Sequence, residues 1–218
     1  LQVLGQQKYE KLTQSKVMVI GLGGVGGYAV ECLTRMGVGS LVLVDFDIIQ
    51  ESNINRQIIA CTSTLGMKKI DAFSTRIYGI NPNCDITKID SKVSHNNINS
   101  LPKDVDFVVD AVDDLDAKIE IYSFCLRNNI NFISSMGMAK RFNPSKVAVK
   151  TLNKTEYDPL AKKIRHICRE KQIDTKAILT VCSEEKPCEL TDLPSIIFVP
   201  SKAGILCAFE CIKSIIQL

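Results

Sequence analysis

The chain has 218 residues, a hydrophobic content of 45% and a net charge of +3 from 27 basic and 24 acidic residues. A chain of this length buries a full core without disulfides or metals, and a charge so near balance excludes a general affinity for polyanions. No apolar run reaches the roughly 20 residues of a membrane helix and the polar stretch up to Lys16 is unlike a signal peptide, so we expect a cytoplasmic protein without membrane contact.

Alternating helices and strands are predicted along the first 137 residues. This pattern predicts an α/β fold: a doubly wound, Rossmann-like, mostly parallel sheet with helices on both faces. The predicted helices cover residues 6–14, 26–36, 68–78 and 116–128. The predicted strands cover residues 16–20, 41–44, 85–89, 107–110 and 131–134. After Gly137 we predict a strand over 146–149, a helix over 158–171 and a closing helix over 203–216.

A glycine-rich turn joins the first predicted strand to the next helix. Gly21, Gly23 and Gly26 satisfy the pattern G-x-G-x-x-G, and Gly24 lies inside it. Backbone N–H groups at such a turn, and the dipole of the helix that follows, face a bound anion. A turn that needs glycine only for packing is the alternative. The position between strand and helix favours a nucleotide.

Polar residues follow the second predicted strand, where a dinucleotide-binding enzyme would continue its fold. Asp45 closes that strand, and its carboxylate can accept hydrogen bonds from both hydroxyls of a ribose. Arg56 presents a planar fork to phosphate oxygens, and Asn53 and Gln57 can orient those oxygens or a metal-bound water. Lys69, thirteen positions after Arg56, adds a point charge at the start of a helix.

Taken singly, each of these is an ordinary surface residue, but their combination resembles the superfamily of ThiF, MoeB, HesA and ubiquitin-activating proteins. The motifs that carry the resemblance are Asp45-Phe-Asp47, Ser52-Asn-Ile-Asn-Arg-Gln57, Lys69 and Asp110-Ala-Val-Asp113. The resemblance implies a site for ATP and Mg²⁺. In that site Asp45 would hold the ribose, and Asp47 would lie nearby. Asp113 would bind the metal. The residues implied to contact the phosphates are Asn53, Arg56, Gln57 and Lys69.

The acids after residue 107 can be ranked as metal ligands. Asp113 and Asp114 are loop acids that a hard cation would accept, whereas Asp110 lies nearer the strand and is the weaker candidate. Asp114 and Asp116 can also cap a helix, and for Asp116 we favour that role. The chemistry is then adenylation, in which a carboxylate attacks the α-phosphate and Arg56, Lys69 and Mg²⁺ neutralise the growing charge. We predict that Arg56, Lys69 and Asp113 are catalytic.

Two segments of the second half indicate a branch of the superfamily. Residues 154–165 contain K-T-x-x-D-P-L-A-x-x-x-R, and 183–187 read Ser-Glu-Glu-Lys-Pro. Both resemble signatures of the tRNA threonylcarbamoyladenosine dehydratases. The resemblance implies an enzyme that adenylates the threonyl carboxylate of a modified adenosine beside the anticodon, so that the ureido group closes a ring. It also implies a homodimer, and one domain over 1–218 with a nucleotide-binding core at 16–137 and a substrate-side elaboration with the closing helix at 138–218.

The predicted helix from Asp158 has a basic face. That face could simply keep the helix soluble, or it could contact the phosphates of a tRNA. The candidate contacts are Lys162, Lys163, Arg165 and Arg169.

Two departures from the family pattern occur. Relatives carry an amino-terminal arginine that reaches the partner subunit's ATP, whereas residues 1–5 here contain none, so that arginine lies upstream or is missing. Lys140 and Arg141 stand where glycines are usual, and we expect them to touch phosphate or to restrict the pocket.

Other functions remain open. One is an activating enzyme that adenylates the carboxyl-terminal glycine of a sulfur-carrier or ubiquitin-like protein partner and passes it to Cys182 or Cys188, although a buried packing role is commoner for cysteine. Another is an inactive nucleotide-binding scaffold or a dinucleotide-binding module. The nine cysteines are odd in number and scattered through apolar stretches, which indicates reduced thiols. They form no C-x-x-C pair, which argues against a structural zinc built from two such pairs.

Overall fold

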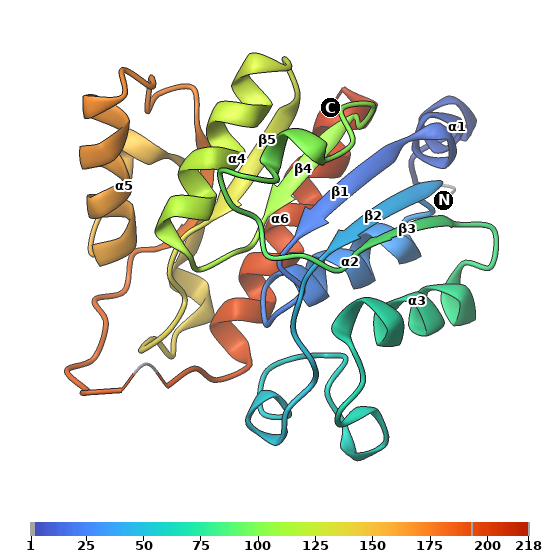
Figure 1. Ribbon diagram of the computed structural model, residues 1–218, viewed down its shortest axis with the longest axis horizontal. Coiled ribbons are helices and arrows are strands. Elements are labelled where there is room, and N and C mark those ends of the chain that lie inside the picture. Colours follow the sequence, from blue (N-terminus) through green and yellow to red (C-terminus); the bar gives the residue numbers. More distant parts are fainter. Residues whose placement is uncertain (1–2, 193, 218) are drawn as a thin grey trace.

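A seven-stranded sheet runs through the centre of the computed structural model, which describes residues 3–192 and 194–217 (Figure 1). The strand order is β3-β2-β1-β4-β5-β7-β6, and every neighbouring pair is parallel except the antiparallel β6 and β7. The strands are β1 (Lys16–Ile20), β2 (Ser40–Val44), β3 (Asp85–Ile89), β4 (Phe107–Asp110), β5 (Asn131–Ser135), β6 (Val147–Thr151) and β7 (Leu179–Ser183). The predicted α/β fold with a mostly parallel sheet is confirmed.

Helices cover both faces of the sheet. They are α1 (Gln6–Gln14), α2 (Gly26–Arg35), α3 (Lys69–Ile80), α4 (Leu115–Arg127), α5 (Pro159–Glu170) and α6 (Phe198–Ile216). One hydrophobic core joins the sheet to α1, α2, α3 and α6, and a second joins its other face to α4 and α5. Val17 of β1 belongs to the first core and Met18 to the second, as expected for a strand buried on both faces. In the part of the chain that the structure describes, no helix is long and apolar enough to cross a bilayer.

Most predicted boundaries lie within two residues of the observed ones, with two differences. The closing helix α6 begins at Phe198, five residues before the predicted start. Pro200 lies in its first turn, where a missing N–H breaks no intrahelical hydrogen bond, so proline does not mark the helix boundary here. Strand β7 was not predicted. Its short apolar run over 179–182 is of a kind that periodicity alone cannot assign.

The sheet reverses its winding direction between β1 and β4. From β1 the order continues to β2 and β3 on one side, and from β4 to β5 on the other. In open α/β sheets, ligands bind in the crevice at the carboxyl ends of the strands at such a switch point. The loops that follow β1 and β4 both border it here, and they carry the glycine turn and Asp113.

Candidate functional site

The turn after β1 can be built only from glycine at two positions. Gly21 has a φ of +86°, and a Cβ on it would lie 2.8 Å from the Ala111 carbonyl oxygen. A Cβ on Gly26 would lie 1.8 Å from the Gly21 carbonyl oxygen. A Cβ on Gly23, by contrast, would meet a single described atom within 4 Å, the Gln57 Nε2 at 3.9 Å. The turn is therefore closed on the β4 side and open on the side of Gly23, where α2 presents its amino terminus.

Asp45 ties this turn to the end of β2. Its Oδ2 accepts a hydrogen bond from the Leu22 N–H at 2.6 Å, and its Oδ1 accepts one from the Asp47 N–H at 2.8 Å. The residue is buried, so it is not a solvated strand end. A carboxylate has about four lone-pair positions, so acceptor capacity remains for a ribose hydroxyl.

Lys69 is the first residue of α3 and is only 4% exposed. Its Nζ lies 2.6 Å from the Asp47 Oδ2 and 3.9 Å from the Asp45 Oδ1. The lysine is therefore held beside the glycine turn by two acids. Asp47 is the more exposed of the two, which makes it the partner that an incoming phosphate would displace more readily.

Arg56 and Gln57 lie over the glycines. The Arg56 Cγ is 3.5 Å from the position of a Cβ on Gly24, and its Nη1 donates to the Ser52 carbonyl at 2.7 Å and to the Asn55 side chain at 2.9 Å. No partner is found among the described residues for the other nitrogens of that guanidinium, which leaves them for an anion. The buried Gln57 Oε1 also lacks a hydrogen-bond donor among these residues.

Asn53 is buried beside them, and its Oδ1 accepts a hydrogen bond from the Gln50 N–H at 3.1 Å. This bond closes the 50–53 turn and so fixes the loop that carries Arg56 and Gln57. The side-chain amide of Asn53 has no acceptor within the described residues, and it remains able to donate to a ligand.

The acids of the loop after β4 take different roles. Asp113 is exposed and has no bonded partner within the described residues. Asp114 caps α4 by accepting from the Ala117 N–H at 3.0 Å, and it also pairs with Lys92 at 2.8 Å. The interpretation of Asp116 as the cap was therefore wrong, because α4 begins one residue earlier than predicted. Asp110 is fully buried in an ion pair with Lys118, so it is not available to a metal.

Magnesium fits this arrangement as a metal held mainly by nucleotide phosphates. Within residues 3–192 and 194–217, no three acidic, histidine or cysteine side chains gather into a metal cage. Mg²⁺ is usually bound by one or two carboxylates together with substrate phosphates and several waters. Asp113 can supply such a carboxylate, and the unpaired Gln57 Oε1 is an acceptor suited to a metal-bound water or a ribose hydroxyl.

Arg141 is not a phosphate ligand, contrary to one expectation from the sequence. It is 6% exposed and donates to the carbonyl oxygens of Tyr157 at 2.9 Å and Glu185 at 3.0 Å. It also lies 3.6 Å from the Asp158 carboxylate. Lys140 likewise donates to a carbonyl, that of Leu190. Both cations hold protein loops together, because a long side chain at these positions reaches neighbouring backbone before it reaches solvent.

On α5, three of the four predicted basic contacts are exposed: Lys162, Lys163 and Arg169. Arg165 is not on that outer face. Its Nη1 donates to the Thr155 carbonyl at 3.0 Å and to the Thr155 hydroxyl, so it ties the helix to the preceding loop. Spacing on a helical wheel could not reveal that a loop covers one edge of the helix.

The two candidate acceptor cysteines differ. Cys182 is buried, and burial raises the pKa of its thiol to about 11, which suits packing and not nucleophilic transfer. Cys188 is exposed, so for that residue the packing interpretation was wrong. At the amino terminus, Leu1 and Gln2 of the stretch without an arginine lie outside the described residues.

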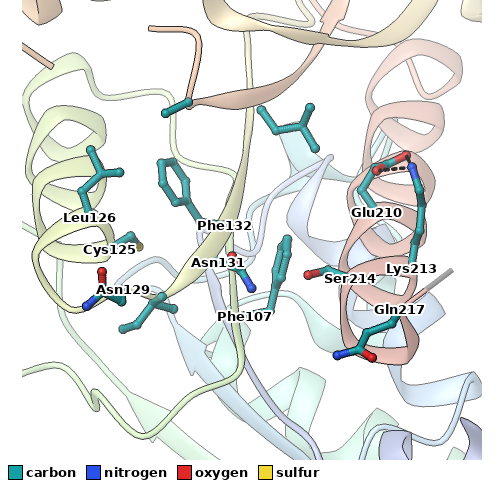
Figure 2. A pocket seen from close by; sticks show the side chains of 13 residues that line it. Phe107, Cys125, Leu126, Asn129, Asn131, Phe132, Glu210, Lys213, Ser214 and Gln217 are labelled. Carbon is teal, nitrogen blue, oxygen red and sulfur yellow. Dashed lines mark hydrogen bonds and ion pairs between the residues drawn. The ribbon is translucent and has the colours of Figure 1, made fainter. Parts of the chain in front are cut away.

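A cavity of about 600 Å³ lies away from the glycine turn, at the amino ends of β4, β5 and β7 (Figure 2). Phe107 and Phe132 lie between α4 and α6, and the α6 side carries the ion pair between Glu210 and Lys213. None of the predicted site residues lines this cavity. A second cavity of about 470 Å³ includes Lys92, His95 and Asp114, beside the loop that carries Asp113.

Sequence analysis missed Lys118 and Ser134, which surround Asp110. No local pattern links these three residues, because they come from a strand, a helix and the next strand.

The comparisons agree with the geometry. The model of the ThiF family matches residues 1–218. The tRNA threonylcarbamoyladenosine dehydratase of Bacillus subtilis is 37% identical over 185 residues, which are 84% of this chain and 72% of that protein. The Haemophilus influenzae enzyme of the same name is 39% identical over 161 residues, 73% of this chain and 62% of that protein, so the match spans less than two thirds of that relative.

Solved structures extend the likeness across the fold. The Escherichia coli tRNA N6-threonylcarbamoyladenosine dehydratase in complex with AMP superposes with a TM-score of 0.94 at 28% identity, over 99% of this chain and 92% of that chain. The same enzyme in complex with ATP gives a TM-score of 0.93 at 28% identity, over 99% and 91%.

Proposed function

The chain belongs to the ThiF family, and from that premise we propose that it is an ATP-dependent tRNA threonylcarbamoyladenosine dehydratase. Its substrate is then a tRNA whose modified adenosine carries a threonyl carboxylate. The enzymes of that name in two bacteria, 37% and 39% identical, support this choice, as does the fold of a third that binds ATP and AMP.

The reaction has two steps. A carboxylate oxygen attacks the α-phosphorus of ATP, and pyrophosphate leaves with the electron pair of the broken bond. The ureido group then attacks the activated carbonyl carbon and loses a proton, and AMP leaves with the oxygen that came from the carboxylate. The nucleoside has lost one water, and ATP has become AMP and pyrophosphate.

The chain's own residues bind and orient the nucleotide. The backbone N–H groups around Gly23 and the free nitrogens of Arg56 face the phosphates, where charge grows during attack. Lys69, which is held in place by Asp45 and Asp47, adds a second cation. Asp113 would hold Mg²⁺, which when bound neutralises phosphate charge. No protein nucleophile is needed.

One observation carries this proposal: Arg56 and Gln57 lie beside the glycine turn. The Arg56 Cγ is 3.5 Å from where a Cβ on Gly24 would stand, and the Gln57 Nε2 is 3.9 Å from where a Cβ on Gly23 would stand. A glycine turn alone serves many nucleotides. An arginine with free guanidinium nitrogens and a glutamine with an unpaired oxygen beside it indicate recognition of phosphates and of the groups around them.

Substitution of Arg56 tests the mechanism. Arg56→Ala should lower ATP–pyrophosphate exchange, measured with tRNA that carries the modified adenosine, by about 100-fold or more, because a cation facing the α-phosphate is removed. Its stability in urea should change by no more than about 0.5 kcal/mol, since the residue is on a loop.

The matched control is Arg127→Ala, which removes an exposed arginine at the end of α4, and exchange should be unaffected. Undiminished exchange in Arg56→Ala would remove the mechanism. If instead a protein with a carboxyl-terminal glycine drives the exchange and modified tRNA does not, the activating-enzyme function would replace the dehydratase.

The basic face of α5 is our candidate contact for the tRNA. Lys162, Lys163 and Arg169 are exposed, and exposed lysine and arginine side chains gain affinity for a phosphate backbone by releasing counterions. The double variant Lys162→Glu and Lys163→Glu should raise the KM for tRNA severalfold and reduce its salt dependence. The KM for ATP should stay unchanged, and a shift in both constants would contradict the assignment.

We propose in addition that the protein is a homodimer. Phe198, Ile205 and Phe209 are spaced along one face of α6 and are 52%, 45% and 52% exposed. Apolar side chains gathered in this way mark contact surfaces.

A further inference from the structure

Four polar side chains form a closed network beneath the loop that follows β4. Asp110, Lys118, Ser134 and Tyr122 are each fully buried. The Asp110 Oδ2 accepts from the Lys118 Nζ at 2.8 Å and from the Ser134 hydroxyl at 2.6 Å. The Ser134 hydroxyl is also 3.0 Å from the Lys118 Nζ and 2.7 Å from the Tyr122 hydroxyl. The network thus links β4, β5 and α4.

Burying such a network in a core costs free energy. Both charges lose their hydration, and apolar residues of similar volume often replace a buried ion pair without loss of stability. Loss of one partner is different, since it leaves the other charge buried and unpaired. A role in positioning is therefore the explanation to test.

The network acts on the loop that borders the glycine turn. The Asp110 Oδ1 accepts from the Val112 N–H at 3.2 Å, which folds the chain back just before Asp113. The Ala111 N–H donates to the Ile20 carbonyl at 2.8 Å, and the Ala111 carbonyl oxygen lies 2.8 Å from the Cβ position of Gly21. Lys118 and Ser134 fix the Asp110 carboxylate, and that carboxylate fixes the loop.

We propose that Lys118 is a positioning residue, which holds Asp110 and through it the 111–113 loop against the glycine turn, so that Asp113 faces the metal of bound Mg²⁺–ATP. The identity of that ligand rests on the proposed function. Lys118 itself touches neither nucleotide nor metal, since it lies in the core between α4 and the sheet.

Binding of ATP with and without magnesium tests this assignment. In Lys118→Met, calorimetry with Mg²⁺ should give an ATP affinity lower by about 10-fold or more, the loss typical when the support of a metal ligand is removed. ATP binding in EDTA should match the wild type, because Arg56 and the glycine turn are unchanged. Hydrogen exchange of the Val112 amide should become faster.

A milder variant and a matched control complete the test. Ser134→Ala removes one donor to Asp110 and keeps the ion pair. Its ATP affinity with Mg²⁺ should therefore fall by a smaller factor. If Lys118→Met does not fold, Ser134→Ala takes its place in the test. Lys88→Met breaks the ion pair with Asp71 at 2.7 Å, which is partly exposed, and it should change neither readout.

Two results would overturn the proposal. One is an equal loss of affinity with and without Mg²⁺, and the other is unchanged affinity with unchanged exchange at Val112. A wild-type protein that binds no ATP would instead refute the proposed function. Exchange at Val112 would then decide alone whether Lys118 positions the loop: faster exchange in the variant supports it and unchanged exchange refutes it.

Discussion

At the scale of single residues, burial divides the cysteines into two groups. All nine are free thiols, as the scattered spacing predicted. Burial raises the pKa of Cys84 and of Cys168 to about 11, and that of the fully buried Cys207 further. Cys61 is exposed, and hydrogen bonds with Ser63 and Thr64 lower the pKa of its thiol to about 7. It is therefore substantially ionised at neutral pH, while the buried thiols are not.

Alkylation kinetics should reveal this difference. The thiolate is the reactive form, so the rate of the fastest iodoacetamide-reactive thiol should rise with pH with a midpoint of about 7. Ser63→Ala should move that midpoint upward, because a hydrogen bond to the thiolate is lost. Cys61→Ser should remove the fast phase. A fast phase that persists in Cys61→Ser would show that another cysteine is the reactive one.

Positions that depend on local order in the sequence were predictable, and contacts that depend on tertiary burial were not. Arg56 and Gln57 follow the strand end by a fixed spacing, and the structure brings both to the glycine turn. Arg141 and Arg165 were candidates for phosphate contact, yet both donate to carbonyl oxygens of loops that pack against them. A charge pattern cannot reveal which loops will cover it.

At the scale of elements, the segments after β5, before α5 and after β7 meet at Arg141. The loop after β5 carries the arginine, Tyr157 and Asp158 lead into α5, and Glu185 follows β7. A second hydrogen bond joins Glu185 to the loop after β5, because its side chain accepts from the Asn143 N–H at 2.8 Å. One buried guanidinium thus organises the two segments that resemble the dehydratase signatures.

Removal of that guanidinium should destabilise the protein. Arg141→Ala leaves the buried carbonyl oxygens of Tyr157 and Glu185 without this donor and removes the cation that lies 3.6 Å from the Asp158 Oδ2. We therefore expect a loss of about 2 to 4 kcal/mol in the free energy of unfolding in urea. Lys163→Ala, which removes an exposed cation on α5, is the control and should change it by no more than about 0.5 kcal/mol. A loss below about 1 kcal/mol for Arg141→Ala would contradict the role assigned to this junction.

Elements with a clear period or a β-branched run were predicted within two residues, as β1 and α1 illustrate. Strand β7 was missed because its residues, Leu-Thr-Val-Cys-Ser, form neither a β-branched run like that of β1 nor a pattern that periodicity alone can assign, and its place between β5 and β6 is decided by packing. The start of α6 was predicted five residues late for a different reason, because its first turn contains a proline.

At the scale of the whole molecule, the exposed apolar face of α6 is the feature that a single chain does not explain. Phe209→Glu places a charge on that face. We expect the wild type to sediment as a dimer and this variant as a monomer. Leu126→Glu, at an exposed apolar residue of α4, is the control and should remain a dimer. A monomeric wild type would contradict the proposal.

The switch point between β1 and β4 is where the parts of the candidate site meet. The sheet order brings the glycine turn, the acid pair of Asp45 and Asp47, and the loop of Asp113 to one edge. The strand pattern predicted the mostly parallel sheet, and in such a sheet the loops after the strands share an edge. It could not predict that Lys118 supports one of them from below.

The most direct test is mass spectrometry of the modified nucleoside. The purified protein is incubated with tRNA that carries threonylcarbamoyladenosine, with and without ATP and Mg²⁺, and the nucleosides are then released and weighed. We predict that the modified adenosine loses the mass of one water only when ATP is present, with one AMP formed for each loss. An unchanged nucleoside mass in the presence of ATP, from protein that binds both ATP and the tRNA, would contradict it.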